Sequence, residues 1–276
     1  MPTCGCYHNF RVALDGQGTY RVEMDLEGTV DMVTMFESSG IAERIEWLGP
    51  AHALKFRGVF RFFGVSDLGK LVALCKTMKS KIIVDLRPNL DFCFALGPYT
   101  LFSADNEHSR SEIGSLLYEA KYRKNEWSVT ALGRQLSQAI REHPILNSVT
   151  AVSSPPGSIP GASNLVRQWT DSIANELEVA AIPATKTRLT PPQKNLDEGV
   201  TEEDAMNQLE NSISVSDVTP DSKVLILDDT IRSGGTMCEL ARALRQAGTT
   251  RVYGLSVAKD ARFTHGRISL MRGDWE

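Results

Sequence analysis

The chain has 276 residues, 42% of them hydrophobic and 23% charged, a composition that is typical of globular proteins and excludes disordered and collagen-like chains. Its formal net charge of −4, from 30 Lys and Arg against 34 Asp and Glu residues, does not indicate a nucleic-acid partner. No apolar run approaches the about 20 residues of a membrane span and the first ten residues do not resemble a signal peptide, so we expect a cytoplasmic protein without a membrane partner.

The first hundred residues predict a strand-rich α+β region without a catalytic motif. Runs of strand-favouring residues occur at 10–15, 20–26, 29–36, 56–65 and 82–86. The first two runs are joined by the turn-forming residues 16–18, and Ser66 and Asp67 begin a helix between the last two. We expect residues 1–108 to form a separate domain whose role the sequence does not reveal.

The five cysteines predict neither disulfides nor a metal site. Their number is odd and their spacing is irregular, which does not fit a disulfide framework. Cys4, Cys6 and His8 lack the second pair of ligands that a structural zinc site needs. We therefore interpret Cys4 and Cys6 as unpaired thiols near a frayed terminus.

Beyond the polar stretch at 103–110, helices and strands alternate, which predicts an α/β domain over residues 109–276. Helical periodicity occurs at 111–122, 129–141 and 165–177. A short strand is expected at 148–152 and a loop at 153–157. Residues 185–199 are polar, basic and proline-containing, which favours a mobile loop.

The most informative stretch is a predicted βαβ unit. Residues 224–227 favour a strand that is buried on both faces. Asp228 and Asp229, which we call the acidic pair, follow this strand. A glycine-containing turn then leads to a helix that begins near Thr236, and residues 251–258 predict the next strand. Ligands of open α/β sheets bind at the carboxyl ends of such strands.

The turn has the composition of a phosphate site, and we call it the phosphate loop. It consists of Arg232, Ser233, Gly234, Gly235 and Thr236. Its backbone N–H groups would lie at a helix amino terminus, where the helix dipole favours an anion. The carboxylates of the acidic pair suit vicinal hydroxyl groups, or the waters around a magnesium ion. A phosphate together with vicinal hydroxyls describes a ribose 5-phosphate.

Residues 224–236 resemble the phosphoribosyl-pyrophosphate (PRPP) motif of type I phosphoribosyltransferases, with four apolar residues, two acidic residues and a Ser-Gly-Gly-Thr turn in register. Within that superfamily, residues 116–123, 153–156 and 190–196 resemble the ComF (competence protein F) group. The resemblance covers about residues 111–260. The cysteine-pair zinc ribbon of that group is not found in the amino-terminal part.

The resemblance implies an α/β fold, a type I phosphoribosyltransferase-like parallel sheet with flanking helices behind the α+β amino-terminal domain. It implies a glycosyltransferase of nucleotide metabolism that transfers 5-phosphoribosyl from PRPP to an unidentified nitrogenous base and releases diphosphate. Magnesium would be bound mainly through PRPP. The acidic pair would hold the ribose and the phosphate loop the 5-phosphate. Diphosphate contacts are expected from Lys186, Arg188, Gln193 and Lys194, and from Ser153 and Ser154 in a loop that has no Lys or Arg.

Several alternatives stay open at this point. The fold would also serve a non-catalytic PRPP or nucleotide sensor, or a ComF-like protein associated with DNA uptake, so whether the chain is an enzyme is not decided. A second copy or a protein partner could bind through the amino-terminal domain. Lys121 and Arg123 fit either a solvated helix face or a diphosphate contact. Arg232 occupies the position where purine-salvage members carry an acidic base, which argues against hypoxanthine or guanine.

Overall fold

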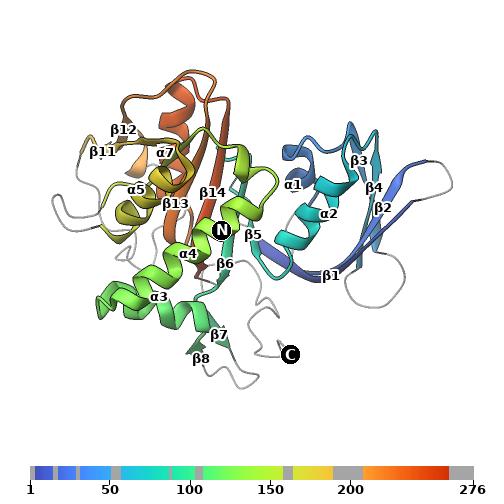
Figure 1. Cartoon of the computed structure of the whole chain (residues 1–276), viewed down its shortest axis with the longest axis horizontal. Helices are drawn as coiled ribbons and strands as arrows, with labels where there is room; N and C mark the ends of the chain where they lie inside the picture. The colour runs from blue at the N-terminus through green and yellow to red at the C-terminus, as the bar shows by residue number, and fades with distance from the viewer. Residues whose placement is uncertain are drawn as a thin grey trace.

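The computed structural model describes residues 4–14, 18–28, 32–50, 57–86, 89–102, 108–157, 164–188 and 208–260. One ten-stranded sheet extends through both lobes of the molecule (Figure 1). Its strands, in spatial order, are β10 (Ala180–Ile182), β9 (Ala151–Ser153), β13 (Lys223–Ile231), β14 (Arg251–Lys259), β6 (Phe92–Pro98), β5 (Ile82–Val84), β1 (Cys4–Leu14), β2 (Tyr20–Gly28), β4 (Arg57–Phe63) and β3 (Arg44–Pro50).

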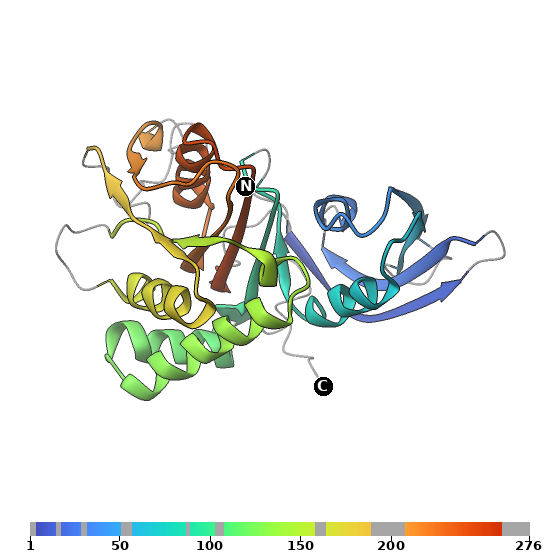
Figure 2. The same cartoon turned by 45° about the horizontal axis from the view of Figure 1, so that its top comes forward.

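The sheet has a parallel half and an antiparallel half. Strands β10, β9, β13, β14 and β6 run parallel, and every pairing from β6 through β3 is antiparallel. Helices α3 (Glu112–Tyr122), α4 (Glu126–Glu142) and α5 (Leu165–Leu177) cover one face of the parallel half, and α7 (Gly235–Gln246) covers the other (Figure 2). The predicted α/β class, with a strand-rich amino-terminal region, is therefore confirmed.

Alternating side chains of β13 show why its segment from Val224 to Leu227 is apolar. Leu225 and Leu227 belong to the core beneath α4 and α5, whereas Val224 and Ile226 pack with α7. A strand covered on both faces has no position at which a polar side chain would meet water. Burial of each such aliphatic side chain stabilises the fold by about 1.5–3 kcal/mol. These layers fix the carboxyl end of β13 in the sheet.

Helices α3 and α5 begin where the sequence predicts, whereas α4 begins at Glu126 rather than at residue 129. Ser111, Asn125 and Asn164 are the amino-terminal caps of α3, α4 and α5, and each side chain accepts a hydrogen bond from a backbone N–H in the first turn. Asp67 caps α2 (Leu68–Thr77) in the same way. Of the described helices, none is both long and apolar enough to cross a membrane.

One predicted strand is wrong. Residues 29–36 were expected to be extended, but α1 spans Met32–Ser38. Met32, Met35 and Phe36 are spaced by three and four residues and are buried, so the helical period prevails over the strand preference of single residues. Phe36 packs edge-on against Phe60 and Phe62 of β4.

The interpretation of the first cysteines is also corrected. Cys4 and Cys6 are buried, and Cys4 lies opposite Val84 where β1 pairs with β5. They are core residues of an ordered strand rather than thiols of a frayed end. The domain boundary at residue 108 stays a prediction. Strand β6, which precedes that boundary, pairs with β14 of the following part.

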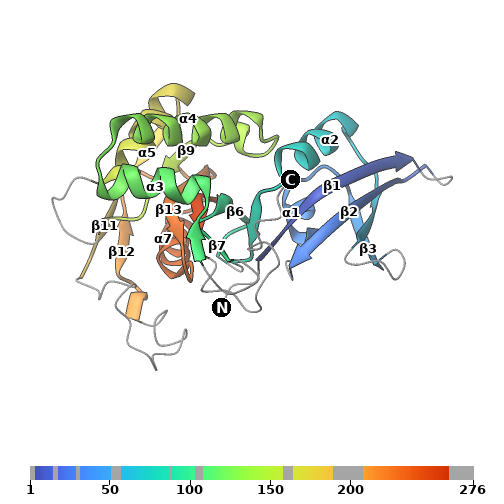
Figure 3. The ribbon, with the colours of Figure 1, turned by 90° about the horizontal axis from the view of Figure 1, so that it is seen from below.

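Two small antiparallel sheets flank the main sheet. Strands β7 (Thr100–Phe102) and β8 (His108–Arg110) pair near the start of α3, and β11 (Ala184–Lys186) pairs with β12 (Ile213–Val215). A single 3₁₀ turn, η1 (Leu146–Ser148), connects α4 to β9. Figure 3 shows α3 and α7 on opposite sides of β13.

Candidate functional site

Strand β13 is longer than the sequence predicts. The strand was expected to end at residue 227, but it continues to Ile231, so the acidic pair lies within it. Its last pairing with β9 joins Ile226 to Ser153, whereas its pairing with β14 continues to Ile231 and Lys259. The part of β13 beyond Ile226 therefore has no backbone pairing with β9. The acidic pair therefore occupies the part of β13 that projects past its neighbour.

The two carboxylates of the acidic pair have different environments. The backbone N–H of Asp229 donates to Asp228 Oδ1 at 2.8 Å, and Lys121 Nζ lies 2.6 Å from Asp229 Oδ2. The pKa of Asp228 is raised to about 7, first by burial and then by the charge of Asp229. The hydrogen bond from the Asp229 N–H and the charge of Lys121 act in the opposite direction.

Lys121 comes from the last turn of α3 and joins that helix to β13. Burial alone would lower the pKa of its ammonium group, but Asp229 outweighs this effect and the pKa is raised. The ion pair places Lys121 against the acidic pair, and its contact with a diphosphate stays a prediction. Arg123, one residue beyond the helix, is exposed.

The phosphate loop joins β13 to α7. Gly234 has a φ of +82°, a left-handed conformation that favours glycine, and a Cβ there would lie 2.4 Å from Leu86 Cδ2. Gly234 is also the amino-terminal cap of α7, and it has no side chain to accept the first N–H groups of the helix. Ser233 Oγ accepts only a long hydrogen bond, of 3.4 Å, from Gly235 N. The helix end can therefore offer N–H donors to an anion.

Two residues that sequence reasoning missed hold the start of this loop. Lys259 Nζ donates to the carbonyl oxygens of Arg232 and Asp260, each at 2.8 Å, and Lys259 is fully buried. Asp260 N donates to Ile231 O at 2.8 Å, and its carboxylate lies 3.9 Å from Arg232 Nε. A signal was present in the sequence, since Lys259 and Asp260 follow an apolar strand just as the acidic pair does.

Ser153 and Ser154 lie at the carboxyl end of β9, beside the middle of β13. Ser153 Oγ donates to the carbonyl oxygen of Ile182 at 2.9 Å, and both serines are buried. The hydroxyl of Ser153 is thus engaged in tying β9 to β10. The predicted contact between these serines and a diphosphate stays a prediction.

The predicted diphosphate residues on the long loop are only partly described. Lys186 is in β11, where its backbone pairs with Ile213. Arg188 Nη2 donates to the carbonyl oxygens of Gln208 and Glu210, at 2.9 and 3.0 Å. The guanidinium group of Arg188 therefore links the chain that follows β11 to the chain that precedes β12. Gln193 and Lys194 lie outside the described residues.

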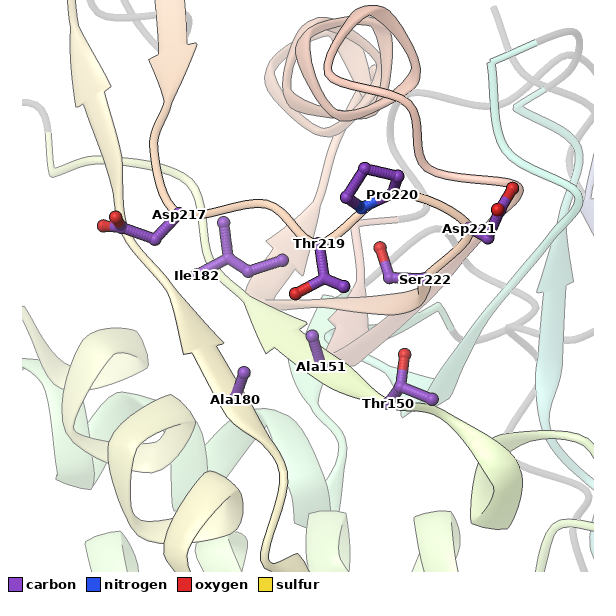
Figure 4. Close-up of a pocket in the computed structure, with 9 residues that line it drawn as sticks. All are labelled: Thr150, Ala151, Ala180, Ile182, Asp217, Thr219, Pro220, Asp221 and Ser222. Carbon is purple, nitrogen blue, oxygen red and sulfur yellow. The ribbon is translucent and has the colours of Figure 1, made fainter.

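A pocket at the opposite ends of the parallel strands does not coincide with this site. It has a volume of about 210 Å³ and lies near the amino-terminal ends of β9, β10 and β13 (Figure 4). Thr150, Ala180 and Ser222 line it, together with the loop from Asp217 to Asp221. Ligands of parallel sheets bind at the carboxyl ends, so we take the acidic pair and the phosphate loop as the candidate site.

Solved structures with a similar chain trace include three phosphoribosyl enzymes. An adenine phosphoribosyltransferase from Thermoanaerobacter pseudethanolicus is 14% identical, with 55% of this chain and 88% of that chain covered and a TM-score of 0.34. An orotate phosphoribosyltransferase from Aeropyrum pernix is 14% identical, with 59% and 86% covered and a TM-score of 0.33. A glutamine PRPP amidotransferase from B. subtilis is 12% identical, with 87% and 48% covered and a TM-score of 0.34. The sequence identities and TM-scores of these structures are too low to indicate a function.

A search of curated proteins found no relative of this chain. A family model, described as the phosphoribosyl transferase domain, matches residues 132–260. The matched segment contains β9, β13, the phosphate loop, α7 and β14, but not α3, which supplies Lys121. The phosphoribosyltransferase-like fold class is therefore confirmed for this segment. The family match supports the resemblance to the type I phosphoribosyltransferase superfamily over these residues, whereas the narrower ComF grouping stays a prediction.

Proposed function

We propose that the protein binds PRPP and transfers its 5-phosphoribosyl group to a nitrogenous base, with release of diphosphate. The observation that carries this proposal is the order of groups along one chain segment. A pair of carboxylates on β13 is followed, within seven residues, by an uncapped helix amino terminus at a glycine that no larger residue could replace without strain. That order matches the hydroxyls and 5-phosphate of one ribose.

In this proposal the acidic pair accepts hydrogen bonds from the ribose hydroxyls. Burial raises the pKa of Asp228, and hydrogen bonds from a bound diol would favour its charged form. The phosphate loop donates its backbone N–H groups to the 5-phosphate. Lys259 and Asp260 keep that loop in place through the carbonyl and guanidinium groups of Arg232. Positioning and charge stabilisation would then carry catalysis, without a covalent nucleophile.

Lys121 would change partners when PRPP binds. Its ammonium group now lies against Asp229, the carboxylate that the proposal assigns to the ribose. A ribose hydroxyl at Asp229 would release the ammonium group, which is then free to contact the diphosphate. Positive charge develops at the ribose C1 in the transition state, and the nearby carboxylates would stabilise it.

Magnesium fits this site as an ion carried by the substrate. Of the residues that the structure describes, no group of three or more His, Cys, Asp and Glu side chains lies close enough to hold a metal ion. The acidic pair could accept hydrogen bonds from the waters of a magnesium ion, while PRPP supplies most of its oxygen ligands. Magnesium would neutralise part of the diphosphate charge as the leaving group departs.

The proposal is tested by binding and by turnover. PRPP with magnesium at about 100 times its dissociation constant should add about 2.7 kcal/mol to the free energy of unfolding and raise Tm. Changing Asp228 and Asp229 together to Asn should abolish most of this shift. Asp171→Asn, a change at an exposed acid of α5, is the matched control and should keep it. An unchanged shift in a folded double variant would refute the ribose assignment.

A sensor that binds PRPP without transferring it is the second candidate. It is favoured by the loop at Ser153, which has no Lys or Arg and whose first hydroxyl is already engaged with Ile182. Diphosphate release separates the two functions. With PRPP, magnesium and a panel of nucleobases, an enzyme should release diphosphate with at least one base. A sensor should bind PRPP and release none above the rate without protein.

A further inference from the structure

The antiparallel half of the sheet ends in an edge strand, β3. It is the last strand of the ten-stranded sheet, and among the described residues it pairs with β4 alone. Backbone N–H and C=O groups on its outer side are therefore available to a further strand. β3 has seven residues, whereas β10, at the other end of the sheet, has three. The β3 edge is thus the longer of the two edges at which another chain could pair.

Opposite charges alternate along one face of this edge strand. Arg44 and Glu46 are two residues apart, so their side chains lie on the same face of the sheet. Arg44 Nη2 lies 3.3 Å from Glu46 Oε1, and the two side chains are 61% and 39% exposed. The Arg44 Cζ also lies 3.9 Å from the centroid of the Phe63 ring. Ile45, between the two charges, is buried on the opposite face.

The same strand exposes two large apolar side chains. Trp47 and Leu48 are neighbours, and they are 45% and 43% exposed. The Trp47 ring stands edge-on to Phe60, with the centroids 5.1 Å apart, so it is already held in place. Tryptophan is enriched in protein interfaces. The pairing with β4 shifts between Trp47 and Gly49, so the regular part of the edge ends at Trp47.

The charges favour one way of pairing two copies of this strand. In an antiparallel pair of identical strands, a two-fold axis passes between two copies of the same residue. With the axis at Ile45, Arg44 lies opposite the partner's Glu46, and by symmetry the pair occurs twice. With the axis at Arg44 or at Glu46, like charges lie opposite each other, which is destabilising. The charged face of β3 is therefore self-complementary only when the axis is at Ile45.

We propose that two copies of the protein form a symmetric dimer through antiparallel pairing of their β3 strands about Ile45. The two sheets then continue into each other. Two cross-strand pairs between Arg44 and the partner's Glu46 flank the axis, and Trp47 lies diagonally across from the partner's Ile45. Both copies use the same edge, so the assembly closes at two chains. The acidic pair lies in the parallel half of the sheet, and the proposed function does not require this contact.

Reversal of a single charge should break the dimer, because symmetry turns both cross-strand pairs into like-charge pairs. Sedimentation of the unchanged protein should show a mass that rises towards that of two chains as the concentration rises. Glu46→Arg and Arg44→Glu should each weaken this association about tenfold or more. Asp171→Arg is the control, because it changes the net charge as much as Glu46→Arg at an exposed position of α5. It should keep the dimer.

A mixture of the two single variants gives the sharper test. When the Arg44→Glu chain pairs with the Glu46→Arg chain, opposite charges meet again at both cross-strand positions. The mixture should therefore form a heterodimer at concentrations where each variant alone is a single chain. Neither variant regains the ion pair within its own strand, so repair of the fold of one chain cannot explain such a result.

Three results would overturn this dimer. If the unchanged protein stays a single chain at every concentration, the β3 edge does not bind a second copy. If both charge reversals leave the dimer intact, the two chains meet at another surface. If each reversal breaks the dimer but the mixture does not associate, Arg44 and Glu46 do not face each other across the axis, and the pairing about Ile45 is wrong.

Discussion

The carboxyl group of Asp228 makes the folded protein sensitive to pH in a direction that can be worked out. Its pKa is raised from 3.8 to about 7, first by burial and then by the charge of Asp229. A raised carboxyl pKa means that the folded chain holds this proton more tightly than the unfolded chain does. Stability should therefore fall as the pH rises from about 4 through about 7.

The expected magnitude follows from the two pKa values. At 1.36 kcal/mol per pH unit, the charged Asp228 would destabilise the fold by about 4 kcal/mol above pH 7. Asp228 keeps part of its surface exposed, so solvent screens some of this penalty, and we expect about 2 kcal/mol. Asp228→Asn removes the charge and keeps an oxygen that can accept the Asp229 N–H. The variant should be about 2 kcal/mol more stable than the unchanged protein at pH 8.

Urea unfolding at pH 8 and at pH 4.5 measures this effect. The gain from Asp228→Asn should be largest at pH 8, smaller at pH 4.5, and should approach zero only below about pH 3.8, where Asp228 becomes protonated in the unfolded chain as well as in the folded chain. Asp171→Asn, which removes an exposed carboxylate from α5, is the control and should not stabilise the protein at either pH. A variant at Asp228 that is less stable at pH 8, or equally stabilised at both pH values, would refute the reasoning.

Three further substitutions test the site. Gly234→Ala should destabilise the protein by about 1–2 kcal/mol more than Gly248→Ala in urea unfolding, because both have positive φ but only Gly234 would place a Cβ against Leu86; equal losses would mean that the contact is relieved. Lys259→Met should lower the free energy of unfolding by about 1–3 kcal/mol for each carbonyl group left unpaired. It should also weaken the binding of ribose 5-phosphate in isothermal titration. An unchanged affinity for ribose 5-phosphate would mean that Lys259 does not support the phosphate loop. Lys121→Met should change stability by less than about 1 kcal/mol, since its ion pair is partly exposed. The same change should weaken the binding of PRPP more than the binding of ribose 5-phosphate. Equal losses of affinity would argue against a contact between Lys121 and the diphosphate.

The βαβ unit could be predicted from the sequence because its signals are local. The apolar run, the acidic pair, the glycines and the apolar face of α7 follow one another along the chain, and each restricts its neighbours. The same locality explains the misassigned α1, where strand-favouring residues and a helical spacing compete within seven residues. Burial of Met32, Met35 and Phe36, the last of these against β4, favours the helix.

The contacts that complete the site could not be predicted in this way. Lys259 reaches Arg232 only because β13 and β14 pair in one register, with Ile231 opposite Lys259. Lys121 reaches Asp229 across about a hundred residues of sequence, through the packing of α3 on the sheet.

The pairing of β6 with β14 has a consequence for any attempt to divide the chain. A fragment that begins at residue 109 would lack β6, and the backbone of β14 would lose its partners from Tyr253 to Lys259. That stretch is buried and apolar along most of its length, so the fragment would present a long unprotected edge to other molecules. Edges of this kind template aggregation. Pairing with β6 therefore protects β14, and with it the half of the sheet that carries the acidic pair, from edge-to-edge association.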